Sequence, residues 1–253
     1  MVREMGASYI VEYFPWAYLE PSPGHYNWAH ADLVVDHALN QGLTVIARLD
    51  LVPSWARPGE TPSRYLEESS FPLYGAFVGT FVRHFQGRVH HIIVWNEPNT
   101  SFEWGFRPPD ASAYAELLKV AYGAVKEVDP DCLVLAAGLA PTLAEEGDPW
   151  AINDLIFLGS LYQAGAREYF DALAVHAYGQ HSPPDEVASS EQINFARVEL
   201  VHELMAQHGD GAKKIFITEG GWNDHPRWVQ AVRPHQRIEY TLRAYQKALA
   251  EWD

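Results

Sequence analysis

Length, composition and charge narrow the class of protein. A chain of 253 residues can form one large domain or two small ones, and α/β barrels often reach this size as a single domain. Hydrophobic residues make up 47% and charged residues 20%, a globular composition that excludes a disordered chain. The net charge of −15 argues against nucleic acid or an anionic membrane surface as a partner.

The sequence lacks several features that would indicate particular classes of protein. No apolar run reaches the roughly 18 residues that a spanning helix needs. The first ten residues have no signal-peptide pattern, and the localisation stays open. The single cysteine, Cys132, excludes an internal disulfide framework and a cysteine-based zinc site. The chain is instead rich in aromatic residues, with nine Trp, 13 Tyr and 11 Phe, which favours a neutral or cationic ligand with flat apolar faces, such as a sugar.

Two kinds of segment alternate along the chain. Short apolar, β-branched runs predict strands at residues 7–14, 43–49, 89–95, 132–138, 170–178 and 213–218. Amphipathic segments predict helices at residues 29–41, 72–86, 109–128, 149–165, 187–208 and 234–252. The strand starts are 36 to 46 residues apart. This alternation indicates a parallel sheet covered by helices on its faces, either a barrel or a doubly wound sheet.

The segments after the strands favour the barrel. None of them contains a GxGxxG or GxxxxGK[ST] turn, so nucleotide-binding doubly wound folds lose support. Instead they are long and rich in Trp, Pro and acidic residues, and the active site of a (β/α)₈ barrel lies on this face. We therefore expect an α/β protein with a TIM-barrel fold.

The number of strands is two short of a complete barrel. With about 40 residues per unit, the chain corresponds to units two to seven, and strands one and eight are not evident. We expect one barrel domain over residues 1–253, either truncated at both ends or closed in an unusual way. The open edges would favour self-association.

Two acidic residues end predicted strands. Glu97 follows the buried run in IIVWNEPN, and Glu219 ends the run in KIFITEGGWN. Each alone could be structural: Glu97 could cap the following turn, and Glu219 could only make hydrogen bonds. They are 122 residues apart, about three strand–helix units, so they would face each other across the barrel mouth. Two opposed carboxylates with aromatic walls are what acid/base cleavage of a glycoside requires.

These motifs resemble those of the clan A retaining glycoside hydrolases, most similar to glycoside hydrolase family 39 and related to families 5 and 42. The resemblance covers nearly the whole chain and rests on residues 16–28 (WAYLEPSPGHYNW), 94–99 (VWNEPN), 129–141, 170–179 and 216–222 (FITEGGW). Asn-Glu-Pro at one strand end, with a second Glu ending a strand three units later, is its specific part. Gly220 departs from the pattern, since a bulky aromatic residue is common there.

The resemblance implies a role for each site residue. Glu97 would be the general acid/base and Glu219 the nucleophile of a retaining β-glycoside hydrolase, without metal or organic cofactor. Asn96 would bind the sugar 2-hydroxyl, while Tyr178 would bond to Glu219 and His176 would tune the pair. The residues expected to form stacking platforms for the carbohydrate are Trp222, Trp16 and, as a weaker candidate, Trp104.

Several other residues have structural interpretations, and the chain has an alternative function. We expect Trp28, Trp150 and Trp252 to pack in the core, and His176 could also be a core histidine. Arg48 and Asp50 lie on the same face of a predicted strand. They could form a buried ion pair or face the substrate, and we favour the ion pair. The alternative function is a non-catalytic carbohydrate-binding or assembly protein on a degenerate barrel. The sugar, its linkage and the choice between exo and endo action are not fixed by these residues.

Overall fold

Six parallel strands follow one another around a curved sheet in chain order. The computed structural model describes residues 3–252. The strands are β1 (Tyr9–Pro15), β2 (Thr44–Asp50), β3 (His91–Val94), β4 (Leu133–Ala136), β5 (Ala172–Tyr178) and β6 (Lys214–Gly221). Each strand pairs in parallel with the next, so all six carboxyl ends point to the same rim. All six strands expected from the sequence are confirmed.

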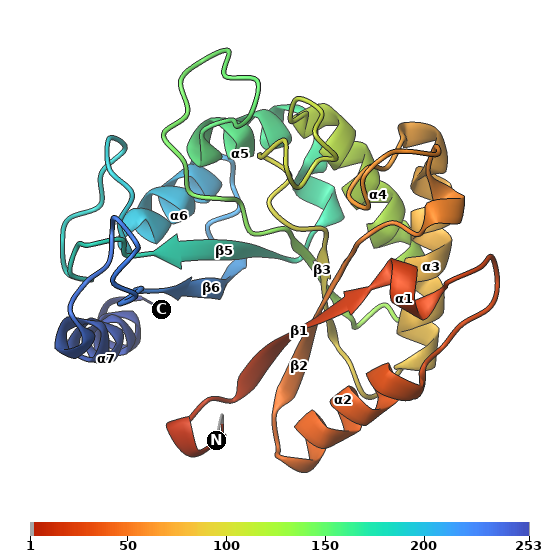
Figure 1. Ribbon diagram of the computed structural model, residues 1–253, viewed down its shortest axis with the longest axis horizontal. Helices are drawn as coiled ribbons and strands as arrows, with labels where there is room; N and C mark the ends of the chain where they lie inside the picture. Colours follow the sequence, from red (N-terminus) through yellow and green to blue (C-terminus); the bar gives the residue numbers. More distant parts are fainter. Residues whose placement is uncertain (1–2, 253) are drawn as a thin grey trace.

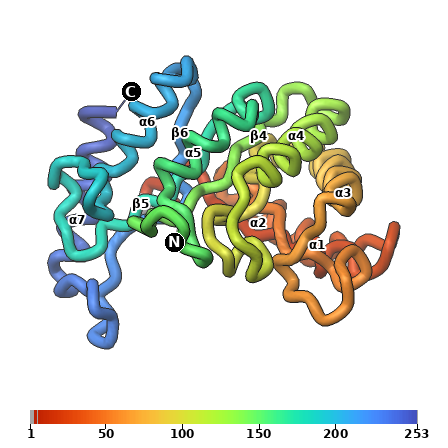
Figure 2. Tube along the Cα trace, turned by 90° about the horizontal axis from the view of Figure 1, so that it is seen from above, coloured from red at the N-terminus to blue at the C-terminus, as the bar shows by residue number. Residues whose placement is uncertain are grey.

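The helices lie outside the sheet, and all except the last connect its strands. They are α1 (Trp16–Leu19), α2 (Ala29–Asn40), α3 (Phe71–His84), α4 (Ala111–Val128), α5 (Asp154–Gln163), α6 (Arg197–Gln207) and α7 (Pro234–Glu251). Seen from above, the chain runs in an arc from the red end to the blue end (Figure 2). In the part of the chain that the structure describes, β1 and β6 are the two edges of the sheet (Figure 1). This is a (β/α)₈-type barrel with six of its eight strand–helix units, as expected.

The central strands β2 to β5 are mostly buried, because helices cover one face and the curved sheet encloses the other, whereas the edge strands β1 and β6 are only partly buried. Every residue of β5 except Tyr178 is buried, which explains the continuous apolar run in its sequence. At the amino ends of the strands the sheet curls far enough for its edges to approach. The ring centre of Tyr9 on β1 lies 5.9 Å from that of Phe216 on β6, and both contact His91 on β3.

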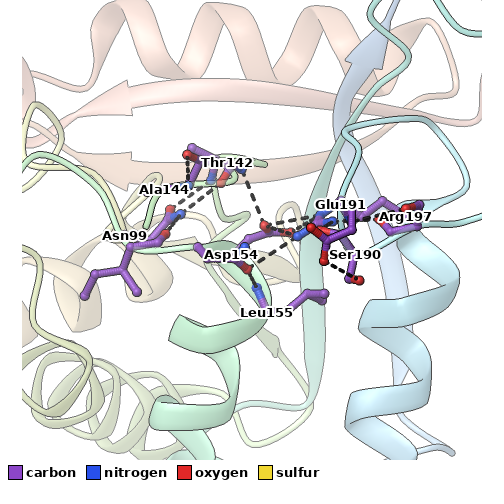
Figure 3. A network of polar contacts seen from close by, with 12 residues as sticks. Asn99, Thr142, Ala144, Asp154, Leu155, Ser190, Glu191 and Arg197 are labelled. Carbon is purple, nitrogen blue, oxygen red and sulfur yellow. Dashed lines mark hydrogen bonds and ion pairs between the residues drawn. The ribbon is translucent and has the colours of Figure 1, made fainter. Parts of the chain in front are cut away.

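Two helices begin later than their sequence pattern predicts. α5 starts at Asp154 and not at 149, because the Asn153 side chain accepts a hydrogen bond from the Leu155 amide and caps the helix there. α6 starts at Arg197 and not at 187. The Arg197 guanidinium binds the carbonyls of Ser189 and Ser190 and pairs with the buried Asp154, so the chain before it is held as a loop (Figure 3). In a helix, the Ser189 and Ser190 carbonyls would instead accept hydrogen bonds from backbone amides four residues later.

Within residues 3–252, no helix combines the length and the apolar character that crossing a bilayer requires.

Candidate active site

The candidate site lies at the carboxyl ends of β2, β3, β5 and β6. Glu97 follows β3, His176 and Tyr178 lie on β5, and Glu219 lies on β6, so the structure brings together four of the residues expected from the sequence. Arg48 on β2 joins them. These side chains contact one another through the hydrogen bonds and ion pairs described below, across strands that are far apart in sequence.

The backbone after β3 is unusual and directs Glu97. Trp95 and Glu97 both have positive φ angles, 74° and 39°, a region that residues other than glycine rarely adopt. Hydrogen bonds hold this conformation: the Glu97 amide donates to the Gly138 carbonyl at 3.0 Å, and the Glu97 carbonyl accepts from the Thr100 amide at 3.0 Å. Strained backbone of this kind clusters at functional sites.

A β-bulge directs Glu219. Val175 on β5 pairs with Ile217, but the next residue, His176, pairs with Glu219, so Thr218 is an extra residue in β6. Such a bulge re-aims the side chains that follow it. Gly220 is required in this bulged strand, because a Cβ there would lie 2.7 Å from the Ala177 carbonyl oxygen. This contact gives a structural reason for the departure from the family pattern at Gly220.

Three groups contact the Glu219 carboxylate. Arg48 Nη1 donates to Oε1 at 2.6 Å, and the Tyr178 hydroxyl donates to Oε2 at 2.6 Å. His176 Nε2 lies 3.8 Å from Oε1. Burial alone would raise the pKa of Glu219, but the charge of His176, the Tyr178 hydrogen bond and Arg48 together lower that pKa below its ordinary value. Glu219 is therefore held as a carboxylate.

Glu97 has a different partner. Its Oε1 lies 2.7 Å from His176 Nδ1, so the imidazole stands between the two carboxylates. His176 is buried, and its ring packs directly over Gly138, where a Cβ would lie 2.4 Å from Cδ2. Glycine at this position therefore leaves the space that the imidazole occupies. His176 is both a buried histidine and a member of the site.

The two carboxylates are close together. A carboxylate oxygen of Glu97, a ring nitrogen of His176 and a carboxylate oxygen of Glu219 all lie within 4.8 Å of one another. Among residues 3–252 this is the one cluster with enough ligand atoms for a metal ion. Its chemistry does not favour a cation, because the Arg48 guanidinium already neutralises Glu219 at ion-pair distance.

Asn96 and Trp222 lie close to the site and are both buried. Arg48 Nη1 donates to Asn96 Oδ1 at 3.0 Å, which fixes the amide beside Glu97. The Trp222 ring packs over Gly179, its Nε1 donates to the Ser182 carbonyl at 2.7 Å, and 9% of the residue is exposed. Little of that ring is open to a sugar, so a platform at Trp222 stays a prediction.

Three tryptophans do not lie where the sequence analysis placed them. Trp16 is fully buried between Trp55, Tyr74 and Phe77, and Trp104 is 2% exposed against Trp95. Neither ring has a free face, so the prediction of stacking platforms at Trp16 and Trp104 is wrong. The opposite correction applies to Trp150, which was expected to pack in the core and is 66% exposed.

Arg48 is a member of the site, although a structural ion pair was the favoured expectation for it. It was expected to pair with Asp50, and its Nε does lie 3.7 Å from Asp50 Oδ2. Its shorter contacts are with Glu219 and Asn96. The one available signal was a basic residue near the carboxyl end of a buried strand, which by itself does not show which partner it faces.

Solved structures share this fold, although no protein-family model and no curated protein matches the sequence. A family 39 glycoside hydrolase from Bacteroides cellulosilyticus WH2 superposes with a TM-score of 0.77 at 21% identity, over 99% of this chain and 50% of that chain. A family 39 β-xylosidase from Caulobacter crescentus gives 0.63 at 22% identity, over 90% and 49%. A fungal β-1,4-galactanase gives 0.66 at 16% identity, over 98% and 76%.

These similarities establish the fold of the chain and show how much of each similar structure it spans. The chain spans about half the length of the family 39 structures that it matches. The strands and helices agree over nearly the whole of the described chain, with TM-scores well above those of unrelated folds. The chain therefore has the barrel fold of these glycoside hydrolase structures, two of which are family 39 enzymes.

Proposed function

We propose that this protein is a retaining β-glycoside hydrolase acting on a polysaccharide or its oligosaccharides. The observation that supports this most directly is the approach of the Glu97 and Glu219 carboxylates, whose nearest oxygens lie within 4.8 Å of each other. Retaining enzymes keep their two carboxyl groups about 5 Å apart, whereas inverting enzymes need a wider gap for a water molecule. The shared fold of glycoside hydrolases is consistent with this activity.

In the first step Glu219 attacks the anomeric carbon. A bond forms between its carboxylate oxygen and that carbon while the bond to the leaving oxygen breaks, and Glu97 gives its proton to that oxygen. Ionised Glu219 suits this role, because Arg48 and Tyr178 both donate to its carboxylate. The product of the step is a glycosyl ester on Glu219, and Glu97 is left as a carboxylate.

In the second step water releases the sugar. Glu97, now a base, takes a proton from water while the water oxygen bonds to the anomeric carbon and the ester bond to Glu219 breaks. Two inversions give net retention. His176 lies 2.7 Å from Glu97 and 3.8 Å from Glu219. Its imidazole is therefore suited to stabilise negative charge on either carboxylate as the reaction proceeds. Asn96 would bind the 2-hydroxyl beside the cleaved bond.

The test is hydrolysis of a panel of aryl β-glycosides by the parent chain and by Glu97→Gln and Glu219→Gln. Glu145→Gln is the matched control, since Glu145 is exposed on the loop after β4. We expect both site variants to lose about 10²-fold or more of kcat/KM, with the control unchanged. For Glu97→Gln the loss should be smaller with a good aryl leaving group, which needs no proton.

The alternative of a carbohydrate-binding protein makes a distinct prediction. The folded parent chain would then hydrolyse none of the glycosides, yet would bind sugars. Equal hydrolysis by the parent chain and both site variants would contradict the proposed mechanism.

A further inference from the structure

Three aromatic side chains are exposed on two loops at the rim. They are Phe102, Phe106 and Trp150, with exposed fractions of 60%, 59% and 66%, and we call them the aromatic patch. Phe102 and Phe106 lie on the loop after β3, and Trp150 lies on the loop after β4. The two loops are joined, because the Ser101 amide donates to the Trp150 carbonyl at 2.7 Å.

A series of contacts connects the patch to Glu97. The Thr100 amide and hydroxyl both donate to the Glu97 carbonyl, at 3.0 and 3.1 Å. Glu103, five residues further along this loop than Pro98, is buried and forms an ion pair with Arg64. The Arg64 guanidinium lies over the Phe102 ring, 5.6 Å from its centre. Phe102 and Phe106 therefore belong to the same packed loop that carries the proposed acid/base residue, and Trp150 lies on the loop joined to it.

The patch is rigid. The Phe102 and Phe106 rings meet edge to face, with their centres 5.7 Å apart. Between them, Gly105 lies against Tyr65 with a φ of +74°, and a Cβ there would be 2.6 Å from the Tyr65 Cα. A rigid aromatic surface can bind a ligand without the entropic cost of ordering a flexible loop.

Two features of the patch do not stabilise the fold. Phe106 has a φ of 59°, a left-handed conformation that is unfavourable for a bulky side chain. Its ring is also left mostly in water, as are those of Phe102 and Trp150, although aromatic residues gain most when they are buried. Strained backbone and grouped exposed aromatic rings are both typical of ligand-binding surfaces.

We infer that the aromatic patch binds sugar rings on the leaving-group side of the cleaved bond. This inference rests on the proposed function, in which Glu97 protonates the leaving oxygen, so the loop that carries Glu97 borders the leaving group. Aromatic faces suit the apolar faces of pyranose rings. The substrate is then a chain with sugar residues beyond the cleaved bond, and not a glycoside of a small alcohol.

The test compares two kinds of substrate that differ only in the leaving group. Xylotriose, cellotriose and β-1,4-galactotriose present sugar rings to the patch, whereas the matching β-glycosyl fluorides present only fluoride. The variants are Phe102→Ala, Phe106→Gly and Trp150→Ala; glycine at 106 removes the ring and suits the left-handed backbone. Phe102→Trp keeps an aromatic ring, and Tyr245→Ala removes an exposed ring on the distant helix α7.

We expect each ring-deleting variant to lower the ratio of kcat/KM for the trisaccharide to that for the fluoride by about tenfold. Phe102→Trp should keep the parent ratio, and Tyr245→Ala should not change it. An unchanged ratio in all three ring-deleting variants would overturn the inference, while hydrolysis of the fluorides that depends on Glu219 would still support the proposed function.

A binding measurement tests the patch independently of turnover. Titration calorimetry of the Glu219→Gln protein should give tighter binding of one trisaccharide than of its monosaccharide, and adding Phe102→Ala should weaken the trisaccharide about tenfold. If no parent activity is found, this arm still decides whether the patch binds sugar rings, while the leaving-group assignment falls with the proposed function. Equal affinity for monosaccharide and trisaccharide would overturn it.

Discussion

The guanidinium of Arg48 on β2 lies 2.6 Å from Glu219 Oε1 on β6, so an ion pair crosses the interior of the curved sheet. Three strands separate β2 from β6 in the sheet, and the two side chains meet only because the sheet curls. The same nitrogen donates to Asn96, next to Glu97 in the chain. Arg48 thus connects the surroundings of the two carboxylates.

Replacing Arg48 tests this connection. We expect Arg48→Met to lower kcat/KM on aryl β-glycosides by about 10²-fold, and Arg48→Lys to lower it less, because lysine keeps the charge but not the geometry of the guanidinium. Arg88→Met is the control, since Arg88 pairs with Asp32 and Asp36 on the outer helix α2. Full activity in Arg48→Met would show that Glu219 does not need this partner.

The Tyr178 hydroxyl should set the acid limb of the pH profile. Its hydrogen bond is one of the contacts that lower the pKa of Glu219 below the ordinary 4.5, and removing a donor to a carboxylate raises that pKa. The acid limb of kcat/KM should therefore move to higher pH in Tyr178→Phe. Tyr122→Phe removes a hydroxyl that faces Asp171 outside the site, and its profile should match that of the parent. An unmoved limb in Tyr178→Phe would refute the role.

The lowered pKa of Glu219 also affects stability. A carboxyl group whose pKa is lower in the folded state stabilises the fold above its unfolded-state pKa, and this contribution is lost as the pH falls through the folded-state value. Chemical denaturation of the parent chain should therefore show stability falling below about pH 4.5, less steeply in Glu219→Gln. Identical slopes for the two proteins would contradict the shift.

Gly138→Ala should disturb His176. The added Cβ would lie 2.4 Å from the imidazole, so the ring must move and its contact with Glu97 must lengthen. We expect a loss of activity and a lower melting temperature. Overpacking should lower the free energy of unfolding by about 1–3 kcal/mol. In Gly123→Ala nothing lies within 4 Å of the new Cβ on the helix α4, so this matched change should raise stability by about 0.5–1 kcal/mol.

The buried pair of Asp154 and Arg197 should be a structural requirement of the loop before α6. Removing the guanidinium leaves Asp154 buried and unpaired and frees the Ser189 and Ser190 carbonyls (Figure 3). We expect Arg197→Met to cost about 3–5 kcal/mol in urea unfolding. Lys119→Met removes an exposed pair with Glu116 and a cation–π contact with Tyr169, and should change stability by less than about 1 kcal/mol.

Much of this arrangement could be predicted from the sequence. Strand positions follow from continuous apolar runs, and the common direction of parallel strands places Glu97, His176, Tyr178 and Glu219 on one rim. These predictions succeed because they depend on strand order and direction, which the spacing of the elements determines. The contact of Tyr178 with Glu219, found at 2.6 Å, was implied by the family resemblance and not by the spacing.

The errors concern side-chain environment. A tryptophan on the segment after a strand can turn into the core, as Trp16 does, or into water, as Trp150 does, although each stands between a proline and an alanine. The role of Arg48 depends on the curvature that brings β2 opposite β6. Helix α6 starts late because of Asp154, a partner 43 residues away. Each of these depends on contacts that are distant in sequence.

The configuration of the first sugar released tests the central claim, that the two carboxylates act by double displacement. Proton NMR during hydrolysis of an aryl β-glycoside distinguishes the anomers before they interconvert. The spacing of Glu97 and Glu219, with oxygens within 4.8 Å, predicts that the β-anomer forms first. Initial formation of the α-anomer would contradict the account.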